Sequence, residues 1–319
     1  MPDRAVILNA DDFGAATNIN NGIEFALQHG AVNAISAITS FPDCISQLQD
    51  VARHYPTCGI GVHLNITTGI PLLSQERVTS LVDRRGNFYP IERIWTHIRR
   101  IDPSELRDEL TARIARLERA GIAIDHLSDH HGVLSLYPPF FEIMIELATH
   151  FQLPVRTPLT ASTRYPSSFP KAQILRRAQA TALRFAACHP LKAARLAPYC
   201  TRSAVQGRVR RLDTGGIAHP DLSIGYFWRN PTLDNMLHIL KHLPPGIHEI
   251  IFHLGSHHRQ TTYPCGLDQT YFANREAELA IVTRAYVREL FDHLQIKRLR
   301  YADIHDIRQF RSEGAPSML

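Results

Sequence analysis

The stretch "ILNADDFG", residues 7–14, places two aspartates directly after an apolar run. The run itself, residues 5–10, is short and bounded by turn-forming residues, which predicts a buried strand of a parallel sheet. Adjacent residues of a regular strand face opposite sides of the sheet. Asp11 and Asp12 can therefore line one site only if the chain bends where this strand ends.

Short apolar runs alternate with segments of helical periodicity along most of the chain. Further strands are predicted at 34–41, 60–66, 123–128, 154–157, 248–255 and 298–303. Helices are predicted at 18–30, 43–55, 102–121, 138–150 and 273–294. This alternation predicts an α/β fold in which crossover helices connect parallel strands. We expect an irregular (β/α) barrel, similar to a TIM barrel, because 319 residues suit one such domain with an insertion.

The region from about 160 to 246 interrupts the alternation and is rich in proline and basic residues. Within it, residues 171–211 contain ten Lys or Arg and no Asp or Glu, so the net charge of +5 is concentrated there. We expect a basic helical insertion over the barrel mouth, with a solvated charged face. Binding of phosphate, an anionic glycan or a membrane surface is the alternative. The segment has few aromatic residues to stack on bases, so nucleic acid is not an expected partner.

The remaining composition favours a cytoplasmic protein without a membrane segment. No run of 18 apolar residues occurs, and the N-terminal sequence is a poor signal peptide. The five cysteines are scattered and form no CxxC pair, which favours reduced thiols over a disulfide framework. The sequence leaves the oligomeric state open, with a homo-oligomer as one outcome.

Polar side chains that can carry chemistry follow several of the predicted strands. They are Asp11 and Asp12, His63 and Asn65, the group "DHLSDHHG" at 125–132, Arg156, and His253. Because the carboxyl ends of barrel strands form the active site, we expect these groups to converge. Two neighbouring carboxylates repel each other unless a cation lies beside them. One aspartate with two histidines makes a three-ligand site with open positions, which suits Zn²⁺, Mg²⁺ or Mn²⁺.

These stretches resemble the motifs of the YdjC-like carbohydrate deacetylases, of which chitooligosaccharide deacetylase is the best-known type. "NADDFG" (9–14) is similar to the N-terminal motif of that family, and "IGVHLNITTGIPL" (60–72) to a second block, G-x-H-L-x-x-x-x-G-x-P. "HLSDHHG" (126–132) resembles a third block, H-x-D-S-H-x-H-V-H. Later blocks are matched by "VRTP" (155–158), "HEIIFHLGS" (248–256) and "NREAELAIVT" (274–283). The resemblance covers nearly the whole chain except the region from about 160 to 246.

The resemblance implies metal-dependent hydrolysis of an N-acetyl group from an amino sugar, an oligosaccharide or a glycolipid. Carried over by position, Asp12, His63 and His130 would hold one divalent ion, Mg²⁺ or Zn²⁺. Asp11 would be the base that takes a proton from a metal-bound water.

The resemblance assigns two more catalytic roles. Arg156 would orient the Asp11 carboxylate by a charge-assisted hydrogen bond. His253 would protonate the departing amine, since an amide anion is too poor a leaving group.

The third block departs from the family pattern. Ser128 and Asp129 stand where the family has Asp followed by Ser, so Asp129 is expected to support a ligand histidine. A local shift would make His131 or His126 the third ligand instead. Asn65, Asp129 and His131 are predicted to contact the substrate, and the exact sugar is left open.

Two other functions fit parts of the pattern. The altered third block is compatible with a sugar-binding relative that has lost catalysis. Two histidines and one carboxylate are also the ligand set of Fe(II) oxygenases. The strand–helix alternation and the additional Asp11 favour hydrolysis over the oxygenase.

Overall fold

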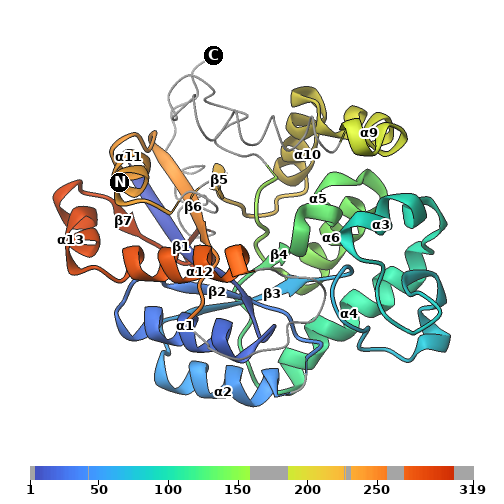
Figure 1. Cartoon of the computed structure of the whole chain (residues 1–319), viewed down its shortest axis with the longest axis horizontal. Coiled ribbons are helices and arrows are strands. Elements are labelled where there is room, and N and C mark those ends of the chain that lie inside the picture. The colour runs from blue at the N-terminus through green and yellow to red at the C-terminus, as the bar shows by residue number, and fades with distance from the viewer. Residues whose placement is uncertain are drawn as a thin grey trace.

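The chain forms an α/β fold around one parallel sheet (Figure 1). The computed structural model describes residues 4–41, 43–158, 186–225, 227, 231–256 and 269–304. The strands are β1 (Arg4–Phe13), β2 (Ala34–Ala37), β3 (Gly59–Leu64), β4 (Leu127–Asp129), β5 (Leu222–Ile224), β6 (Gly246–Phe252) and β7 (Lys297–Arg298). Their order is β4-β3-β2-β1-β6-β5, and β7 pairs with the first residues of β1. Every strand pair in this sheet is parallel.

Helices connect the strands and cover the outside of the sheet (Figure 1). The α-helices are α1 (Thr17–Gln28), α2 (Cys44–His54), α3 (Ile91–His97), α4 (Pro103–Arg119), α5 (Val133–Leu136), α6 (Pro138–Phe151), α9 (Pro190–Leu196), α10 (Arg202–Thr214), α11 (Leu233–Lys241), α12 (Gln269–Val282) and α13 (Ala285–His293). Short 3-10 helices are η1 (Gln75–Arg77), η2 (Thr79–Leu81), η3 (Ile98–Arg100), η4 (His130–Gly132) and η5 (Ala197–Cys200). No helix in the described ranges is both long and apolar enough to cross a bilayer.

The two edges of the sheet are linked through residues 154–157. Val155 forms an isolated parallel bridge with Leu127 of β4, and its N–H donates to the carbonyl oxygen of Ala218 at 2.9 Å. Ala218 lies just before β5, the opposite edge strand. The parallel pairing of the strands confirms the predicted α/β fold with a parallel sheet. The sheet is a half-barrel whose two edge strands are joined by this irregular segment. The closer likeness to a TIM barrel stays a prediction.

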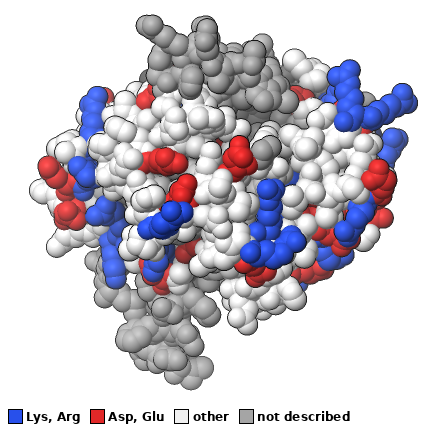
Figure 2. All heavy atoms as spheres, turned by 90° about the horizontal axis from the view of Figure 1, so that it is seen from below, with Lys and Arg blue, Asp and Glu red and all other residues white. Residues whose placement is uncertain are grey.

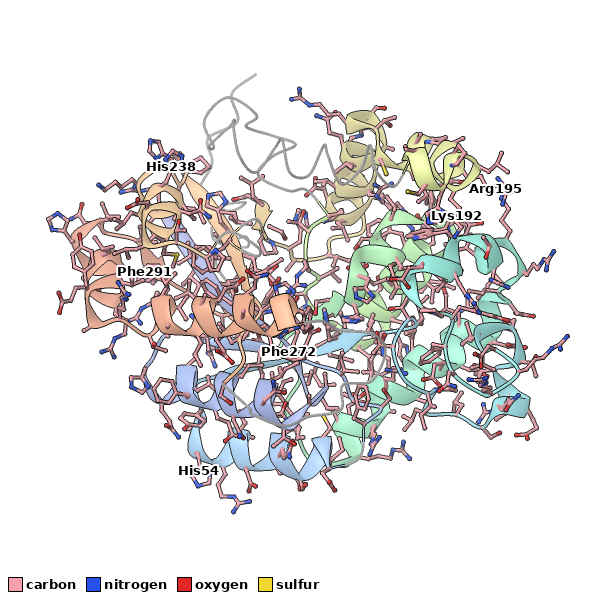
Figure 3. All side chains as sticks on the ribbon, viewed as in Figure 1. His54, Lys192, Arg195, His238, Phe272 and Phe291 are labelled. Atoms are coloured by element: carbon pink, nitrogen blue, oxygen red, sulfur yellow. The ribbon has the colours of Figure 1, made fainter. Side chains whose placement is uncertain are left out.

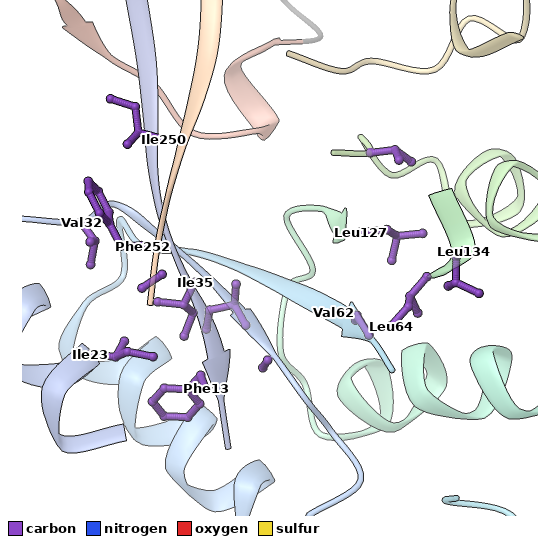
Figure 4. Close-up of a cluster of buried hydrophobic side chains, with 14 of the residues drawn as sticks. Phe13, Ile23, Val32, Ile35, Val62, Leu64, Leu127, Leu134, Ile250 and Phe252 are labelled. Carbon is purple, nitrogen blue, oxygen red and sulfur yellow. The ribbon is translucent and has the colours of Figure 1, made fainter. Parts of the chain in front are cut away.

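The inside of the half-barrel changes from apolar to polar along β1. Ala5 and Ile7 lie in a small buried cluster with Ala34, Ile247, Leu299, Tyr301 and Ile304. The next residues on the same side of β1 are Asn9 and Asp11, both buried. The opposite side of β1 packs into the large apolar cluster under the helices (Figure 4). The carboxyl ends of the strands therefore surround a buried polar site.

Local capping fixes the start of α4. In α4, Asp102 accepts a hydrogen bond from Ser104 N–H at 2.8 Å, and Pro103 occupies the first turn. Both features are strong helix start signals, which is why the predicted helix at 102–121 agrees with the structure to within two residues. The predicted strand at 154–157 is reduced to the single bridge at Val155.

Part of the predicted insertion belongs to the sheet itself. Strand β5 and helix α11 lie within the range 160–246 and continue the strand–helix pattern. Of the basic segment, residues 171–185 lie outside the described residues. In the described part, Lys192 and Arg195 of α9 lie at the periphery (Figure 3). On the face seen in Figure 2, basic and acidic side chains are interspersed. A basic insertion over the mouth stays a prediction.

Candidate active site

A β-bulge at the end of β1 turns both aspartates toward the same site. The pairing of β1 with β2 shifts between Asp11, which pairs with Ser36, and Phe13, which pairs with Ala37. Asp12 is the extra residue and has φ 75°, a left-handed conformation that costs about 1 kcal/mol or more outside glycine. The bend expected at the strand end is therefore this bulge.

Asp12, His63 and His130 form one cluster. Asp12 Oδ1 lies 3.1 Å from His130 Nδ1 and 3.5 Å from His63 Nε2. One possible ligand atom from each residue lies within 4.8 Å of the others. His63 comes from β3, and His130 begins the η4 turn just after β4. The ends of β1, β3 and β4 thus supply one oxygen and two nitrogen atoms to one cluster.

The cluster fits a divalent metal ion. Ligand atoms about 2.0–2.2 Å from a common ion lie roughly 3–3.5 Å apart. Asp12 Oδ1 lies at such distances from the two imidazole nitrogens, 3.1 and 3.5 Å. Asp12 Oδ1 is buried and has no hydrogen-bond partner among the described residues, although both imidazoles lie beside it. A buried carboxylate oxygen without a partner is costly, and coordination would satisfy it. The donor set suits Zn²⁺ and more oxygen-tolerant divalent ions alike.

Hydroxyl groups orient both histidines of the cluster. His63 Nδ1 lies 2.8 Å from Ser128 Oγ, and His130 Nε2 lies 3.1 Å from Thr68 Oγ1. Each contact occupies the ring nitrogen farther from Asp12 and leaves the other nitrogen for the cluster. Burial lowers the pKa of His63 to about 3, so this ring is neutral near pH 7.

The loop after β3 is organised by Asn65. Its Oδ1 accepts hydrogen bonds from the N–H groups of Thr67 and Thr68, both at 3.0 Å, and its Nδ2 donates to Thr68 O at 2.7 Å. Thr67 Oγ1 then lies 2.9 Å from His131 Nδ1. Asn65 therefore shapes the loop that carries the hydroxyl partners of His130 and His131.

Asp11 is held in a buried ion-pair network. Arg156 donates from Nη1 to Asp11 Oδ2 at 2.8 Å and from Nη2 to Oδ1 at 2.7 Å. Arg156 also pairs with Glu249, through Nε to Oε2 at 2.9 Å and Nη2 to Oε1 at 2.7 Å. Burial alone would raise the pKa of Asp11, but the Arg156 guanidinium holds it well below its usual range. Asp11 is therefore ionised and fixed in direction.

Asp12 forms an ion pair with a second arginine, Arg275. Arg275 of α12 donates from Nη2 to Asp12 Oδ2, and its guanidinium lies against the Tyr271 ring. Burial opposes ionisation, but Arg275 and then His130 lower the pKa of Asp12 well below its usual range. One carboxylate oxygen is thus bound to Arg275 and the other faces the histidines.

His253 lies directly after β6, near both aspartates. Its backbone N–H donates to Glu278 Oε2 of α12 at 2.8 Å. Burial lowers the pKa of His253 to about 4, although the charges of Asp12 and Asp11 favour its protonated form. The imidazole is therefore neutral near pH 7. Burial also raises the pKa of Glu278 to about 8.

The third block is arranged differently from the expectation. Asp129 accepts hydrogen bonds from Ser135 N–H at 2.9 Å and Ser135 Oγ at 2.8 Å, so it fixes the start of α5. The expected support of a ligand histidine by Asp129 is therefore wrong, because Ser128 makes that contact. His126 bonds to Ser36 Oγ at 3.0 Å. Neither His126 nor His131 belongs to the three-residue cluster.

Sequence reasoning missed several residues that hold the site, among them Glu249, Arg275, Thr68 and Ser36. A signal existed for two of them. Glu249 is an acidic residue directly before the apolar run "IIF" (250–252) of a predicted strand, and buried charges of this kind are usually paired. Arg275 lies in "NREAELAIVT", a stretch that already resembled a family block. Nothing in the sequence around Ser36 indicates its role, because its partners in the site lie far away along the chain.

Comparisons with known proteins identify the family of this chain. The model of a family described as YdjC-like protein matches residues 5–293. The chain is 34% identical over 159 residues to a carbohydrate deacetylase from Brevibacillus brevis, and 32% identical over 152 residues to one from Vibrio vulnificus strain CMCP6. These matches cover 50% and 48% of this chain, and 61% and 58% of the relatives. The chain thus spans about three fifths of the length of these curated relatives.

The fold is similar to that of a solved structure from Enterococcus faecalis V583, named as a candidate cellobiose-phosphate cleavage protein. The TM-score is 0.72 with 22% sequence identity, and the match covers 94% of this chain and 98% of that chain. This likeness concerns the fold alone. The family match extends over most of the sequence and includes every residue of the buried site. The chain belongs to the YdjC-like protein family.

Proposed function

We propose that this protein is a metal-dependent carbohydrate deacetylase, which hydrolyses an N-acetyl group on an amino sugar or glycoconjugate. The observation that carries the proposal is the Asp12–His63–His130 cluster beside an ionised, arginine-bound Asp11. The curated relatives named carbohydrate deacetylase support the reaction class. Because they are matched over only part of their length, the substrate class is part of the proposal.

Asp12, His63 and His130 would hold one divalent ion, Zn²⁺ or Mg²⁺. When bound, such an ion lowers the pKa of a coordinated water and draws electron density from a carbonyl oxygen. The protein's contribution is a fixed ligand set. Ser128 and Thr68 orient the two rings, and Arg275 occupies the remaining oxygen of Asp12.

Asp11 acts as the base that accepts the proton of the attacking water. Arg156, itself held by Glu249, fixes the orientation of the Asp11 carboxylate, so this side chain need not reorient before the reaction. The same ion pair keeps Asp11 ionised at every physiological pH. Its low basicity means that the proton stays only briefly and must move on to the leaving group.

His253 gives the proton to the departing amine nitrogen. Since burial lowers its pKa to about 4, the ring is neutral at the start and must gain the proton during the reaction. A neutral imidazole near Asp11 can receive that proton and pass it on. Asn65, Asp129 and His131 stay proposed substrate contacts. The polar atoms of Asn65 are already hydrogen-bonded to Thr67 and Thr68, and those of Asp129 to Ser135, so His131 is the stronger candidate.

An acetate-release screen tests this function. The metal-loaded protein is incubated with acetylated monosaccharides, oligosaccharides, glycolipids and nucleotide sugars, with and without a chelator. We expect acetate from at least one class, loss of release after chelation, and recovery when Zn²⁺ or Mg²⁺ is returned. Sugar binding without acetate release would instead identify a non-catalytic relative. Turnover that requires oxygen and a co-substrate would identify an Fe(II) oxygenase.

A further inference from the structure

A continuous chain of buried side chains runs from His63 away from the site. Ser128 Oγ lies 2.8 Å from His63 Nδ1 and 2.9 Å from Ser36 Oγ. Ser36 Oγ lies 3.0 Å from His126 Nε2, and His126 Nδ1 lies 3.2 Å from Asp125 Oδ2. The proposed mechanism uses none of the residues beyond Ser128. Their order, carboxylate–imidazole–hydroxyl–hydroxyl–imidazole, links a remote aspartate to one histidine of the cluster.

Asn9 fixes one of the hydrogen bonds in the middle of this chain. Its Nδ2 donates to Asp11 Oδ1 at 2.8 Å, so the amide nitrogen rather than the oxygen must face that carboxylate. The same Nδ2 donates to Ser36 Oγ at 2.9 Å. One acceptor position of Ser36 is therefore taken. Ser36 can accept one more hydrogen bond and donate one, to Ser128 or to His126.

Only two proton arrangements then satisfy every contact in the chain. In the first, Ser36 donates to His126 Nε2, Ser128 donates to Ser36, and His63 donates from Nδ1 to Ser128. In the second, every one of these bonds is reversed, and the proton of His63 moves to Nε2. The first arrangement leaves a lone pair on His63 Nε2, facing Asp12. The second points an N–H at the place where a metal ion would lie.

Asp125 selects the first arrangement. Its Oδ1 accepts the N–H of Ala302 at 3.0 Å, and its Oδ2 faces His126 Nδ1. An ionised carboxylate only accepts hydrogen bonds, so the ring nitrogen that faces it, His126 Nδ1, carries a proton. A ring with this one proton leaves its Nε2 to accept from Ser36. Burial opposes ionisation, but the contacts to His126 and to backbone N–H groups lower the pKa of Asp125 below its usual value.

The surrounding structure makes room for this pair of residues. A Cβ added at Gly61 would lie 2.3 Å from the His126 ring, and one at Gly59 would lie 2.3 Å from Asp125 Oδ2. The ring of Tyr301 stacks on His126, with centroids 4.1 Å apart. Two strand positions without side chains and one stacked ring thus hold Asp125 and His126 in place.

We propose that Asp125, His126, Ser36 and Ser128 are positioning residues that fix the proton of His63 on Nδ1 and aim its Nε2 lone pair at the metal position. Carboxylates commonly orient metal-binding histidines by direct contact, and replacing such partners costs about 10–100-fold in metal affinity. Here the orienting carboxylate acts at a distance, through three intervening side chains. The inference rests on the proposed metal site, but the tautomer of His63 does not depend on a bound ion.

The test is the variant Asp125→Asn, measured in two ways. Nitrogen-15 NMR of labelled histidine reads which ring nitrogen of His63 carries the proton in the metal-free protein. Competition with a chromophoric chelator gives the Zn²⁺ affinity of the same sample. If the amide oxygen keeps the hydrogen bond from Ala302, the amide NH₂ faces His126 and reverses the chain. We expect His63 to change from the Nδ1–H to the Nε2–H tautomer, and Zn²⁺ affinity to fall at least tenfold.

Two further variants separate positioning from loss of stability. Ser36→Ala breaks the chain with a small substitution, and we expect mixed His63 tautomers and weakened Zn²⁺ binding. Asp221→Asn is the matched control, because Asp221 also accepts a backbone N–H, from Ile247 at 2.8 Å, at the amino end of the sheet. It should change neither readout.

An unchanged His63 tautomer in both Asp125→Asn and Ser36→Ala would overturn the inference. So would an Nε2–H tautomer in the unsubstituted protein. If the tautomer changes as expected but no variant and no parent protein binds Zn²⁺, the positioning chain stands. In that case the proposed metal site is what fails.

Discussion

Asp11 and Asp12 are chemically identical neighbours with different partners. Arg156 takes both oxygens of Asp11, whereas Arg275 takes one oxygen of Asp12 and leaves the other facing two imidazoles. The partners therefore determine which carboxylate can ligate a metal. The sequence places the two aspartates, but their roles depend on arginines 145 and 263 residues away along the chain.

Glu249→Gln should reduce turnover without removing the metal. The substitution takes one carboxylate from Arg156 and loosens the orientation of Asp11, so we expect kcat to fall about 10–100-fold. It should also destabilise the fold by about 3 kcal/mol, because it breaks a buried ion pair. Steady-state kinetics, metal content and urea unfolding measure the three effects.

Glu142→Gln is the control for that substitution. Glu142 pairs with Arg211 at 3.0 Å, and both side chains are half exposed, so its loss should cost less than about 1 kcal/mol. Equal kinetics for the Glu249 variant and the parent protein would show that Arg156 needs only Asp11 to hold its position.

Glu278 should make stability fall as the pH rises. Its pKa is about 8 in the folded protein against 4.5 for a free side chain, so between these values the folded state holds a proton that the unfolded state lacks. The free energy of unfolding therefore decreases with pH across that window, by up to about 1.4 kcal/mol per pH unit. Glu278→Gln does not titrate. We therefore expect the difference in the free energy of unfolding, variant minus parent, to increase from pH 5.5 to pH 7.5 in urea unfolding. The same difference at both pH values would contradict the raised pKa of Glu278.

At the scale of elements, the strand ends explain both what sequence reasoning predicted and what it missed. The alternation of apolar runs and helical segments predicted β1, β3, β6 and the cap of α4, because these depend on local periodicity and turn chemistry. A bend at the end of β1 was expected, but its form as a bulge at Asp12 was not predictable, nor was the left-handed turn at His131, with φ 60°. The pairing of β3 with β4 places Ser128 opposite His63, so Ser128 rather than Asp129 contacts that ring.

Gly61→Ala tests the space that β3 leaves for the ring of His126. A Cβ would lie 2.3 Å from an imidazole that is held by stacking and hydrogen bonds, so the ring cannot move aside cheaply. We expect a loss of about 2 kcal/mol or more and a lower Tm. Gly207→Ala in α10 is the control, since only the tip of Arg210 lies within 4 Å and alanine favours a helix. A Gly61 variant as stable as the Gly207 variant would show that His126 is loosely held.

Across the whole molecule, the half-barrel has an apolar base and a polar upper interior. The small apolar cluster around Ile7 and Tyr301 closes the base, and Asn9, Asp11, Arg156 and Glu249 fill the interior above it. A buried polar interior is stable only when its side chains are hydrogen-bonded or paired with one another. The fold class was predictable from one sequence because alternation is a property of the whole chain. The Arg156–Asp11 contact was expected only from the resemblance to a family, and its extension to Glu249 was not predicted, because the network joins strands far apart in sequence.

Metal loading should stabilise the entire fold. An ion that binds only the native state at 100 times its Kd adds about 2.7 kcal/mol. We expect a chelator to lower the Tm by a few degrees and added Zn²⁺ to restore it. Asp12→Ala should show no metal-dependent shift. A shift of equal size in that variant would place the binding site elsewhere.

The hydrolytic role of this site is tested most directly by Asp11→Asn, compared with the parent protein at equal metal content. Asn keeps the shape of Asp11 but cannot accept the proton, whereas the proposed ligands Asp12, His63 and His130 are unchanged. On a substrate identified in the acetate-release screen, the variant should bind one equivalent of metal and lose about 10²–10⁴-fold in kcat. A variant that releases acetate at the parent rate with the same metal content would contradict the role of Asp11 as the base.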